Sequence, residues 1–459
     1  MSEQIELFKG ALCFTPIWAI VDLLLIIHFF FSWYRSVKKT GWKIDFWYLT
    51  LFIATFPSLL FLYPFNASIF NDFYTLGLQY LIAPNVDFAF SISVLGYLSI
   101  WMGRWIFDFT RGKFPFLILF QLTNPICKIV ENNMKSKRAC LFFVCMALAL
   151  GFCILALQFK EGCFFNARGL FLKQPFLRPV FNLAVAIFSI VSSFLALRYI
   201  QYKEKKSLLI FCSLLLFTLF FGVRSLGLSA VLFLFQQWIY YREGRCSFFK
   251  LIGICSGLFL IAIVLGNWRE GNFNFQYFLP ALLFKILYGN NFSDTRDFAW
   301  ILTYWDEEYL YGKTYLAALI SFIPRAFSSI REEWSISMYT NRLTGFDSET
   351  MPGLRPGMFG ESFFNFSYPG VVLFGLLFGF ALRYGDLKIK EHVMKSKDII
   401  KGNSCLFVFF FLSQLSVSAS MWSFYVFLFV NLAIFFIRKI AKSRFTSFSN
   451  LGIQKLPRE

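Results

Sequence analysis

The chain has 459 residues, of which 58% are hydrophobic and only 15% are charged, and its formal net charge is +18. Soluble proteins carry about 25% charged residues. Apolar runs long enough to cross roughly 30 Å of hydrocarbon recur along the whole chain. This composition excludes an ordinary soluble enzyme and indicates an all-α protein that crosses a membrane many times.

The apolar runs predict about eleven membrane-spanning helices. In chain order they cover residues 11–34, 45–64, 86–108, 139–158, 180–199, 207–222, 225–241, 249–266, 367–384, 404–419 and 421–438. The chain then divides into a bundle of the first eight spans over 1–266, a large loop over 267–366, and the last three spans with a basic tail over 367–459.

Lys and Arg fall in alternate connections between these runs, as in Lys38 and Lys39, in 203–206, and in the tail after 438. Cytoplasmic loops of membrane proteins carry such an excess of basic residues. The pattern predicts an outer N-terminus, an inner C-terminus and an outer location for the loop 267–366. The net charge therefore reports orientation in a lipid bilayer, and no nucleic-acid partner is expected.

Arginines in and beside the outer loop are candidate ligands for a phosphate-bearing lipid. The loop 267–366 contains six Arg and two Lys, and the planar guanidinium group of Arg holds phosphate oxygens bidentately. Another Arg stands between two apolar runs, where a charge usually marks a substrate site or reaches to the interface. The candidate diphosphate ligands are Arg224, Arg296, Arg325 and Arg355. Pairing with neighbouring acids or lipid headgroups is the alternative for each.

The segment 351–370 combines glycine- and proline-rich turns with one Arg and one Glu at the mouth of a predicted span. A Glu at an apolar rim can act as a general base. Glu361 is therefore the first candidate catalytic residue, followed by Asp294 and Asp297. A structural pair between Glu361 and Arg355 is the competing interpretation.

Residues 290–312 and 313–327 carry the start signals and apolar spacing of helices, and we expect these helices to lie along the outer interface. Aromatic side chains crowd the same region, among them Trp300, Tyr304 and Trp305. Such residues normally anchor a protein at the membrane interface. They could also stack on sugar rings.

Several sequence features are absent. The only histidines are His28, in the first run, and His392, in an inner loop, so a His-based zinc site is not expected outside. The nucleotide-binding pattern G-x-x-x-x-G-K-[ST] does not occur. We therefore predict neither a metal nor a cofactor.

Four stretches resemble the Wzy-type O-antigen and oligosaccharide repeat-unit polymerases. They are GVRSLGLS (222–229), GNNFSDTRDFAWIL (289–302), GKTYLAALISFIPR (312–325) and PGLRPGMFGESFFNFSYPGV (352–371). The resemblance is dense over about 220–380, and elsewhere only the hydropathy profile agrees. One departure is Ser367-Tyr368-Pro369, where many members of the family carry a glycine after Asn-Phe.

The resemblance implies a bacterial inner-membrane glycosyltransferase whose fold is similar to the GT-C type and whose active site faces the periplasm. Its donor would be a growing glycan on undecaprenyl diphosphate, and its acceptor one repeat unit on the same lipid. An acceptor hydroxyl would attack the anomeric carbon, and undecaprenyl diphosphate would leave. The arginines would hold the diphosphate, and Glu361 or one of the two aspartates would take the proton. A polysaccharide chain-length regulator is a further candidate partner.

Two other functions fit parts of the sequence. An O-antigen ligase has a large outer loop and uses the same lipid donor, but ligases resembling this chain carry a His in that loop, and this loop has none. A lipid-linked oligosaccharide flippase, which is a transporter, usually shows two matched halves and short outer loops. Neither feature is found here, so polymerisation of O-antigen for lipopolysaccharide is the leading hypothesis.

Overall fold

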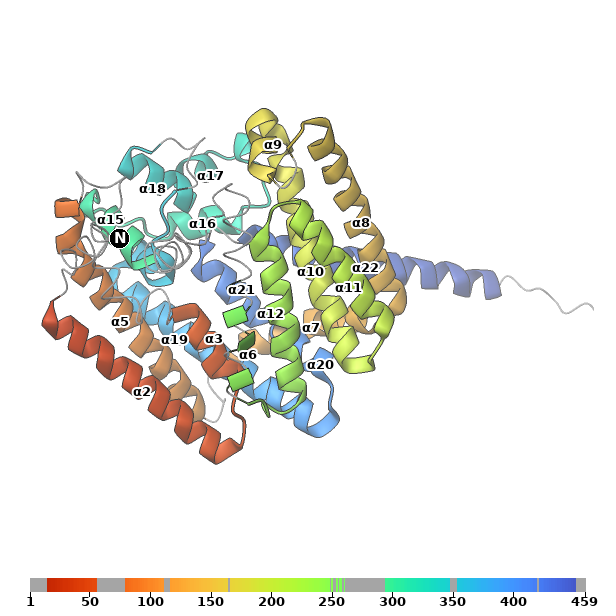
Figure 1. Cartoon of the computed structure of the whole chain (residues 1–459), viewed down its shortest axis with the longest axis horizontal. Coiled ribbons are helices and arrows are strands. Elements are labelled where there is room, and N and C mark those ends of the chain that lie inside the picture. The colour runs from red at the N-terminus through yellow and green to blue at the C-terminus, as the bar shows by residue number, and fades with distance from the viewer. Residues whose placement is uncertain are drawn as a thin grey trace, which may run out of the picture. The chain divides into compact units, whose positions relative to one another are not determined.

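The computed structural model describes residues 15–55, 79–110, 116–163, 166–247, 294–346, 353–418 and 421–450, with a few residues between 249 and 260. Within these ranges every regular element is a helix, and no strand occurs (Figure 1). The prediction of an all-α protein is therefore confirmed.

Seven helices in the described ranges are long and apolar enough to cross a membrane, which indicates a multi-pass membrane protein. They are Pro16–Thr40, Pro84–Phe109, Lys137–Lys160, Arg178–Tyr202, Gly357–Ser396, Ile399–Ser416 and Met421–Ile440. Two shorter apolar helices, Phe46–Thr55 and Leu226–Tyr241, coincide with two further predicted spans. The predicted span 249–266 lies largely outside the described residues, so the count of eleven stays a prediction.

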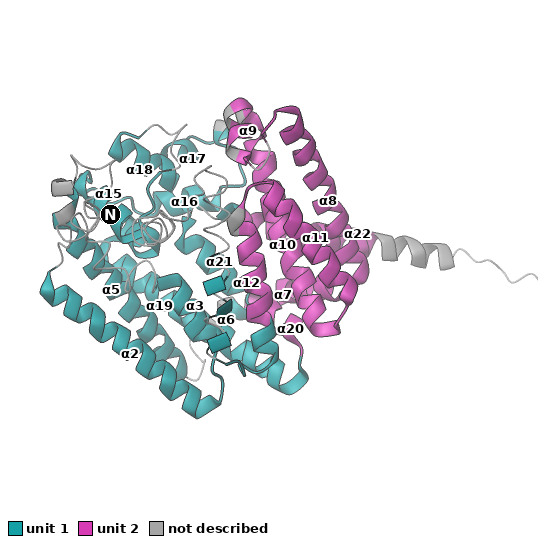
Figure 2. Cartoon of the chain, in the orientation of Figure 1, with its two compact units in different colours: residues 1–121, 238–397, 405–422 teal, residues 122–237, 398–404, 423–459 magenta. Residues whose placement is uncertain are grey.

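The helices form two compact units (Figure 2). Unit 1 contains α2 (Pro16–Thr40), α3 (Phe46–Thr55), α5 (Gln79–Phe109), α6 (Phe116–Leu122), α15 (Asp294–Thr303), α16 (Lys313–Leu319), η5 (Arg325–Phe327), α17 (Ser329–Trp334), α18 (Ile336–Thr344), α19 (Gly357–Ser396) and α21 (Phe407–Ser416). Unit 2 contains α7 (Asn124–Lys135), α8 (Lys137–Lys160), α9 (Ala167–Lys173), η3 (Pro175–Leu177), α10 (Arg178–Tyr202), α11 (Lys205–Phe220), α20 (Ile399–Ser404) and most of α12 (Arg224–Tyr241) and α22 (Met421–Asn450). Each unit joins stretches that are distant in sequence. The three-part division predicted from the sequence, into 1–266, 267–366 and 367–459, stays a prediction.

The core of unit 1 is the close crossing of α5 and α19. A Cβ atom at Gly375 would lie 2.6 Å from the Cβ of Ser99 and 2.8 Å from the carbonyl oxygen of Gly96. One at Gly379 would overlap the carbonyl oxygen of Ile100. Because small residues spaced four apart let two helix backbones approach closely within a membrane, these two glycines fix where α19 lies against α5.

α5 and α19 run in the same direction, and they place the segment 294–346 at one end of the pair. At the amino end of α5, α15 packs along the helix, and Asn85 Nδ2 donates to Thr303 Oγ1 at 3.1 Å. At the carboxyl end of α5, Arg383 of α19 donates to Asp108 at 2.8 Å. The candidate site residues of the loop and the basic ends of the helices therefore lie at opposite ends of unit 1.

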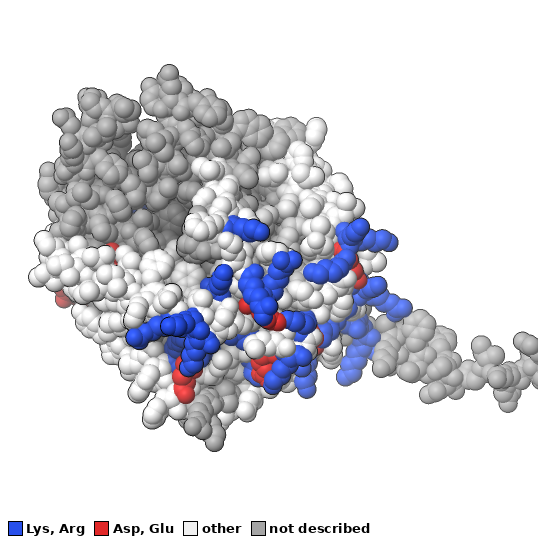
Figure 3. Space-filling model, turned by 60° about the horizontal axis from the view of Figure 1, so that its bottom comes forward, with Lys and Arg blue, Asp and Glu red and all other residues white. Residues whose placement is uncertain are grey.

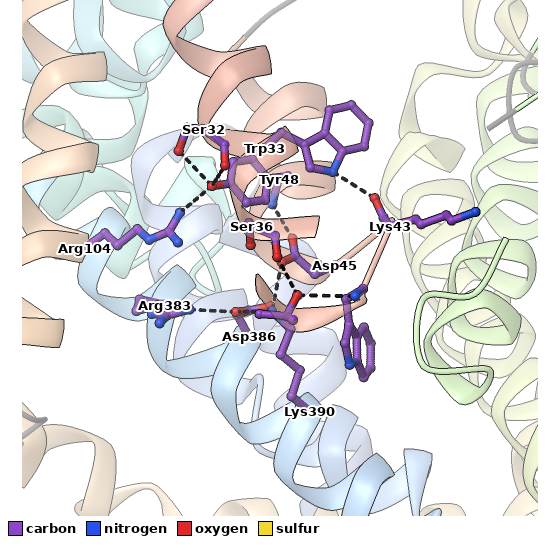
Figure 4. Close-up of polar contacts among 12 residues, drawn as sticks. Ser32, Trp33, Ser36, Lys43, Asp45, Tyr48, Arg104, Arg383, Asp386 and Lys390 are labelled. Carbon is purple, nitrogen blue, oxygen red and sulfur yellow. Dashed lines mark hydrogen bonds and ion pairs between the residues drawn. The ribbon is translucent and has the colours of Figure 1, made fainter. Parts of the chain in front are cut away.

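A buried ion network joins the loop after α2 to α19 at this second end (Figure 4). Lys390 Nζ lies 2.8 Å from Asp45 Oδ2 and 2.9 Å from Asp386 Oδ2. Arg383 contacts Asp386 at 3.0 Å as well as Asp108 at 2.8 Å. Each of these carboxylates therefore has a cation beside it, as the burial of charge requires.

Many Lys and Arg side chains lie exposed on the face of the molecule that Figure 3 draws. In unit 1, Lys390 and Arg383 belong to the ion network. In unit 2, the Arg198 guanidinium donates to the carbonyl of Lys135 in α7 at 3.0 Å and binds Glu204 at 3.0 Å. The orientation that the sequence predicts from its charge pattern stays a prediction.

Candidate active site

α19 is broken in its amino-terminal third. Phe366 (φ −138°, ψ 17°) and Ser367 (φ 56°, ψ −154°) leave helical geometry. Pro369 has no N–H group, so the carbonyl of Asn365 cannot make its usual helical hydrogen bond. The helix therefore consists of a short piece over 357–365 and a long piece after the break, and the sequence had placed the start of the span at residue 367.

The chain before α16 caps the short piece. Leu310 N donates to the carbonyl of Phe364 at 2.9 Å, and Tyr311 N donates to that of Asn365 at 3.0 Å. Gly312 follows at φ 87°, and a Cβ there would lie 3.0 Å from the ring of Phe366. This cap satisfies two carbonyls that the break leaves without helical partners, and it fixes α16 against the break.

Glu361 lies inside this joint and is only 2% exposed. Its Oε1 accepts from the Thr314 hydroxyl at 2.9 Å, and its Oε2 accepts from the backbone N of Ser418, just after α21, at 3.1 Å. Both donors are neutral. Among the described residues Arg355 is not a partner of this carboxyl group, so the structural pair that competed with the catalytic interpretation does not form here.

Asn365 extends the cluster by one step. Its Nδ2 donates to the Thr314 hydroxyl at 2.7 Å and to the carbonyl of Glu361 at 2.8 Å. Its Oδ1 is buried and has no hydrogen-bond partner within the described residues. Because buried acceptors are normally satisfied, this oxygen offers a position for a hydroxyl group beside Glu361.

Asp294 and Asp297 lie in the first turn of α15 with Arg296, and Arg355, which precedes α19, lies close to them. Asp297 Oδ1 accepts from Arg296 at 3.3 Å, and its Oδ2 accepts from the backbone N of Arg355 at 3.3 Å. Burial raises the pKa of Asp294 to about 6, while the nearby charge of Arg355 acts in the opposite direction. The turn therefore holds one paired carboxylate and one that changes protonation near pH 6.

The candidate diphosphate ligands differ in their surroundings. Arg296 is 8% exposed and directs its guanidinium at Asp297, whereas Arg355 and Arg325 have exposed side chains. Arg325 Nη2 lies 3.4 Å from the hydroxyl of Ser337. Arg224 is the first residue of α12, in unit 2, and its side chain lies outside the described residues. Among the candidate arginines whose side chains the structure describes, Arg355 and Arg325 are the exposed ones.

The three aromatic candidates are also placed differently. Trp300 is 8% exposed and meets Phe346 edge-on at 5.5 Å, so almost its whole ring surface is covered. Trp305 packs against Phe363 at 5.4 Å. Tyr304 is 37% exposed. Trp300 packs within α15, where nearly every residue faces the interior. Trp305 follows that helix and is half-buried, and Tyr304 is the most exposed of the three.

Sequence reasoning did not single out Thr314, Ser418 or the cap at Leu310 and Tyr311. They reach Glu361 and the break across about 50 residues of chain, so no local spacing connects them. Pro369, four residues after Asn365, was the one local signal that a carbonyl would need another donor.

Within the described part of the chain, no group of three or more His, Cys, Asp or Glu side chains could hold a metal ion. No family model, curated protein or solved structure matches the chain. A functional assignment therefore depends on the residues themselves and on the resemblance of their motifs.

Proposed function

We propose that the protein is an O-antigen polymerase of the Wzy type, a glycosyltransferase of the bacterial inner membrane. The single observation that carries the proposal is Glu361, a buried carboxyl group with neutral donors only, in the short piece of a broken helix that starts two residues after the exposed Arg355. Discontinuous helices recur at the substrate sites of membrane proteins.

The proposal includes the orientation and the span count. Eleven spans with an outer N-terminus leave the Lys-rich ends of the helices in the cytoplasm. The Glu361 cluster lies at the opposite end of unit 1 and would then face the periplasm, where lipid-linked repeat units are joined. The lipids would enter from the bilayer, and a chain-length regulator would be the partner that sets polymer length.

The reaction needs a proton acceptor and a cation. The acceptor hydroxyl hydrogen-bonds to Asn365 Oδ1 and passes its proton to Glu361 as its oxygen attacks the anomeric carbon of the donor. The bond between that carbon and the diphosphate oxygen breaks, and undecaprenyl diphosphate leaves with the bonding electrons. Arg355 and Arg325 stabilise the charge that develops on it. The diphosphate bond supplies the driving force, so neither ATP nor a cofactor is needed.

Neutral donors suit Glu361 to this role. Thr314 and Ser418 orient the carboxyl group, and no cation has to be displaced before it takes a proton. Asp294 is the second candidate base, because its pKa of about 6 leaves it ionised at neutral pH. Asp297, which accepts from Arg296, is better suited to holding α15 in place.

A glycan gel on cells that lack the protein tests the proposal. Complementation with wild type should restore a ladder of polymer, while Glu361→Gln should leave single repeat units on the carrier lipid A. A Glu332→Gln variant, which changes an exposed Glu of the same loop, is the control and should restore the ladder. Loss of even the single-repeat product in the deleted cells would contradict a polymerase and indicate a ligase or a flippase.

A further inference from the structure

The break in α19 reverses the direction of the chain. A Cβ atom at Gly370 would lie 2.7 Å from the carbonyl oxygen of Ser362, which stands eight residues earlier. In a continuous helix, eight residues rise about 12 Å. The short piece over 357–365 and the long piece after Ser367 therefore lie side by side and form a helical hairpin, whose turn is the break.

The amino end of the short piece lies far along α5. Near the turn, the ring of Phe363 meets that of Phe88 at 5.7 Å between centroids. Toward the amino end, the ring of Phe359 covers Gly96 so closely that a Cβ there would overlap it. The short piece thus runs opposite to α5, and Phe359 lies near the middle of the candidate span Pro84–Phe109.

α15 reaches the same depth in unit 1. Its carboxyl end is held at the amino end of α5, where Asn85 donates to Thr303 at 3.1 Å. Its amino end lies at the start of the short piece, since a Cβ at Gly357 would be 3.2 Å from the Cβ of Asp294. From Asp294 to Thr303 the helix rises about 13 Å. Asp294 and Gly357 therefore lie about 13 Å further along α5 than Asn85 does.

α2 shows what surrounds unit 1 at this depth. It runs parallel to α5, because Trp18 meets Phe90 at 6.0 Å and, further on, His28 meets Trp101 at 4.9 Å. Leu23, midway between these contacts, is 56% exposed. Exposed apolar side chains in the middle of a helix that can cross a membrane face lipid. Hydrocarbon therefore begins well before the depth that the hairpin and α15 reach.

Arg355 is polar and exposed in this region. Residues 353–356 are not helical, and the side chain of Arg355 is exposed. Its backbone N donates to Asp297 of α15 at 3.3 Å, which fixes its depth. A charged side chain in contact with hydrocarbon is costly. Non-helical backbone at membrane depth occurs where protein buries it or where it lines a water-filled cavity. Since Arg355 is not buried, the second case applies to it.

We propose that water enters unit 1 from the end that carries 294–346 and fills a vestibule that reaches Arg355 within the thickness of the bilayer. The vestibule is lined by Arg355 and by Met358, which is half-buried in the first turn of the short piece. It admits hydrophilic ligands to a depth that lipid occupies on the far side of α2. A reaction at Glu361, in the same hairpin, would then take place below the membrane surface; this clause alone rests on the proposed function.

A charged thiol reagent, trimethylammonioethyl methanethiosulfonate, tests the vestibule on the full-length protein in nanodiscs, where both membrane faces are open. Arg355→Cys and Met358→Cys should react at least about a hundredfold faster than Leu98→Cys, because neither the reagent nor a thiolate enters hydrocarbon. Leu98 is the matched control, since it is 48% exposed on α5 and lies two residues after Gly96. Peptide mass measures the modification at each position separately from the native cysteines.

Three further readings complete the test. Tyr304→Cys, just after α15, changes a side chain that is 37% exposed and gives the rate for a thiol in water. Native Cys246 of the same unit is 6% exposed and should stay unmodified, which shows that the variants are folded. Met358→Cys keeps Arg355, so its labelling does not result from loss of that charge. If Arg355→Cys and Met358→Cys both react as slowly as Leu98→Cys, hydrocarbon surrounds them and the proposal is overturned.

The vestibule and the polymerase can fail separately, because labelling needs no catalysis. If the vestibule variants react rapidly but cells without the protein keep their polymer, the vestibule stands and the polymerase does not. If the deleted cells lose polymer while both variants react as slowly as Leu98→Cys, the polymerase stands and the vestibule does not.

Discussion

Unit 1 buries two polar clusters whose partners differ in kind. In the ion network, the carboxylates of Asp45 and Asp386 each contact Lys390 at less than 3 Å (Figure 4). In the cluster at the break of α19, the carboxyl group of Glu361 is held by Thr314 and by the backbone of Ser418, neither of which is charged.

The difference separates a structural role from a chemical one. A carboxylate between cations cannot take up a proton without breaking ion pairs in a poorly hydrated place, so the network is suited to joining α19 to α3 and α5. A carboxyl group that only neutral donors hold can exchange a proton with a bound hydroxyl. Substitutions in the first cluster should therefore damage folding, and those in the second should damage turnover.

The largest expected effect is that of Lys390→Met. It leaves Asp45 and Asp386 buried beside each other without their shared cation, which should cost roughly 3–5 kcal/mol of stability. The yield of folded protein and its melting temperature in detergent would measure this. Lys388→Met is the matched control, because Lys388 pairs with Glu391 near the surface at 3.0 Å and such pairs contribute about 0–1 kcal/mol. Equal melting temperatures for the two variants would show that the ion network does not hold the helices.

The next effect is that of Glu361→Gln, which keeps the shape of the side chain but cannot take a proton. Turnover of a lipid-linked donor in vitro should fall by about 10²–10⁴-fold while the melting temperature changes little. Thr314→Val removes one orienting donor but leaves the carboxyl group, so a loss of about tenfold is expected. If Glu361→Gln weakens donor binding as much as turnover, its role is structural and the contrast between the two clusters fails.

Much of the fold could be predicted from hydropathy, and part of the site from motifs. The long apolar helices fall where the runs predict them, and the break at Ser367 falls at the predicted start of a span. Ser367 has a positive φ at this break, which glycine would adopt without steric cost. The cap at Leu310 and Tyr311 and the donors Thr314 and Ser418 could not be predicted, because these contacts depend on how distant segments pack.

The burial of individual side chains was the property that the sequence predicted least well. The segment 290–312 is predicted to form a helix along the outer interface that packs onto the bundle, with Trp300 as an anchor or a surface for sugar stacking. In the structure, the residues from Thr295 to Leu302 are all buried. Polar and aromatic residues in a membrane protein can face other helices as readily as water. The partners of charged side chains could not be predicted either. Arg296 binds its neighbour Asp297. Glu361 does not bind Arg355, because Glu361 faces inward from the short helical piece, whereas Arg355 precedes that piece.

Asp294 is intermediate between the carboxylates of the ion network and Glu361. It is buried, and the charge of Arg355 acts on it. Its folded pKa of about 6 exceeds its ordinary value of 3.8, so the folded state disfavours the ionised form. The cost is absent below about pH 4, grows as the pH rises to about 6 and is complete above it, where it amounts to roughly 2–3 kcal/mol. Asp294→Asn should therefore raise the melting temperature at pH 8 and not at pH 4. A constant difference across this range would mean that the pKa of Asp294 is the same in the folded and unfolded states, so that burial does not disfavour its ionised form.

The smallest effect concerns the strain at the break itself. Ser367 has a positive φ, which a residue with a Cβ adopts at a cost of about 1–2 kcal/mol, and its hydroxyl donates to Tyr309 Oη at 3.0 Å. Ser367→Ala and Ser367→Gly both lose this hydrogen bond, but only glycine relieves the backbone. Ser367→Gly should thus be more stable than Ser367→Ala by about 1 kcal/mol, which paired melting curves can resolve. Equal stability would mean that the chain relaxes at this point without strain. A glycine variant that is more stable but turns over more slowly would indicate that the rigid break, like the neutral donors, serves to hold Glu361 toward its substrate.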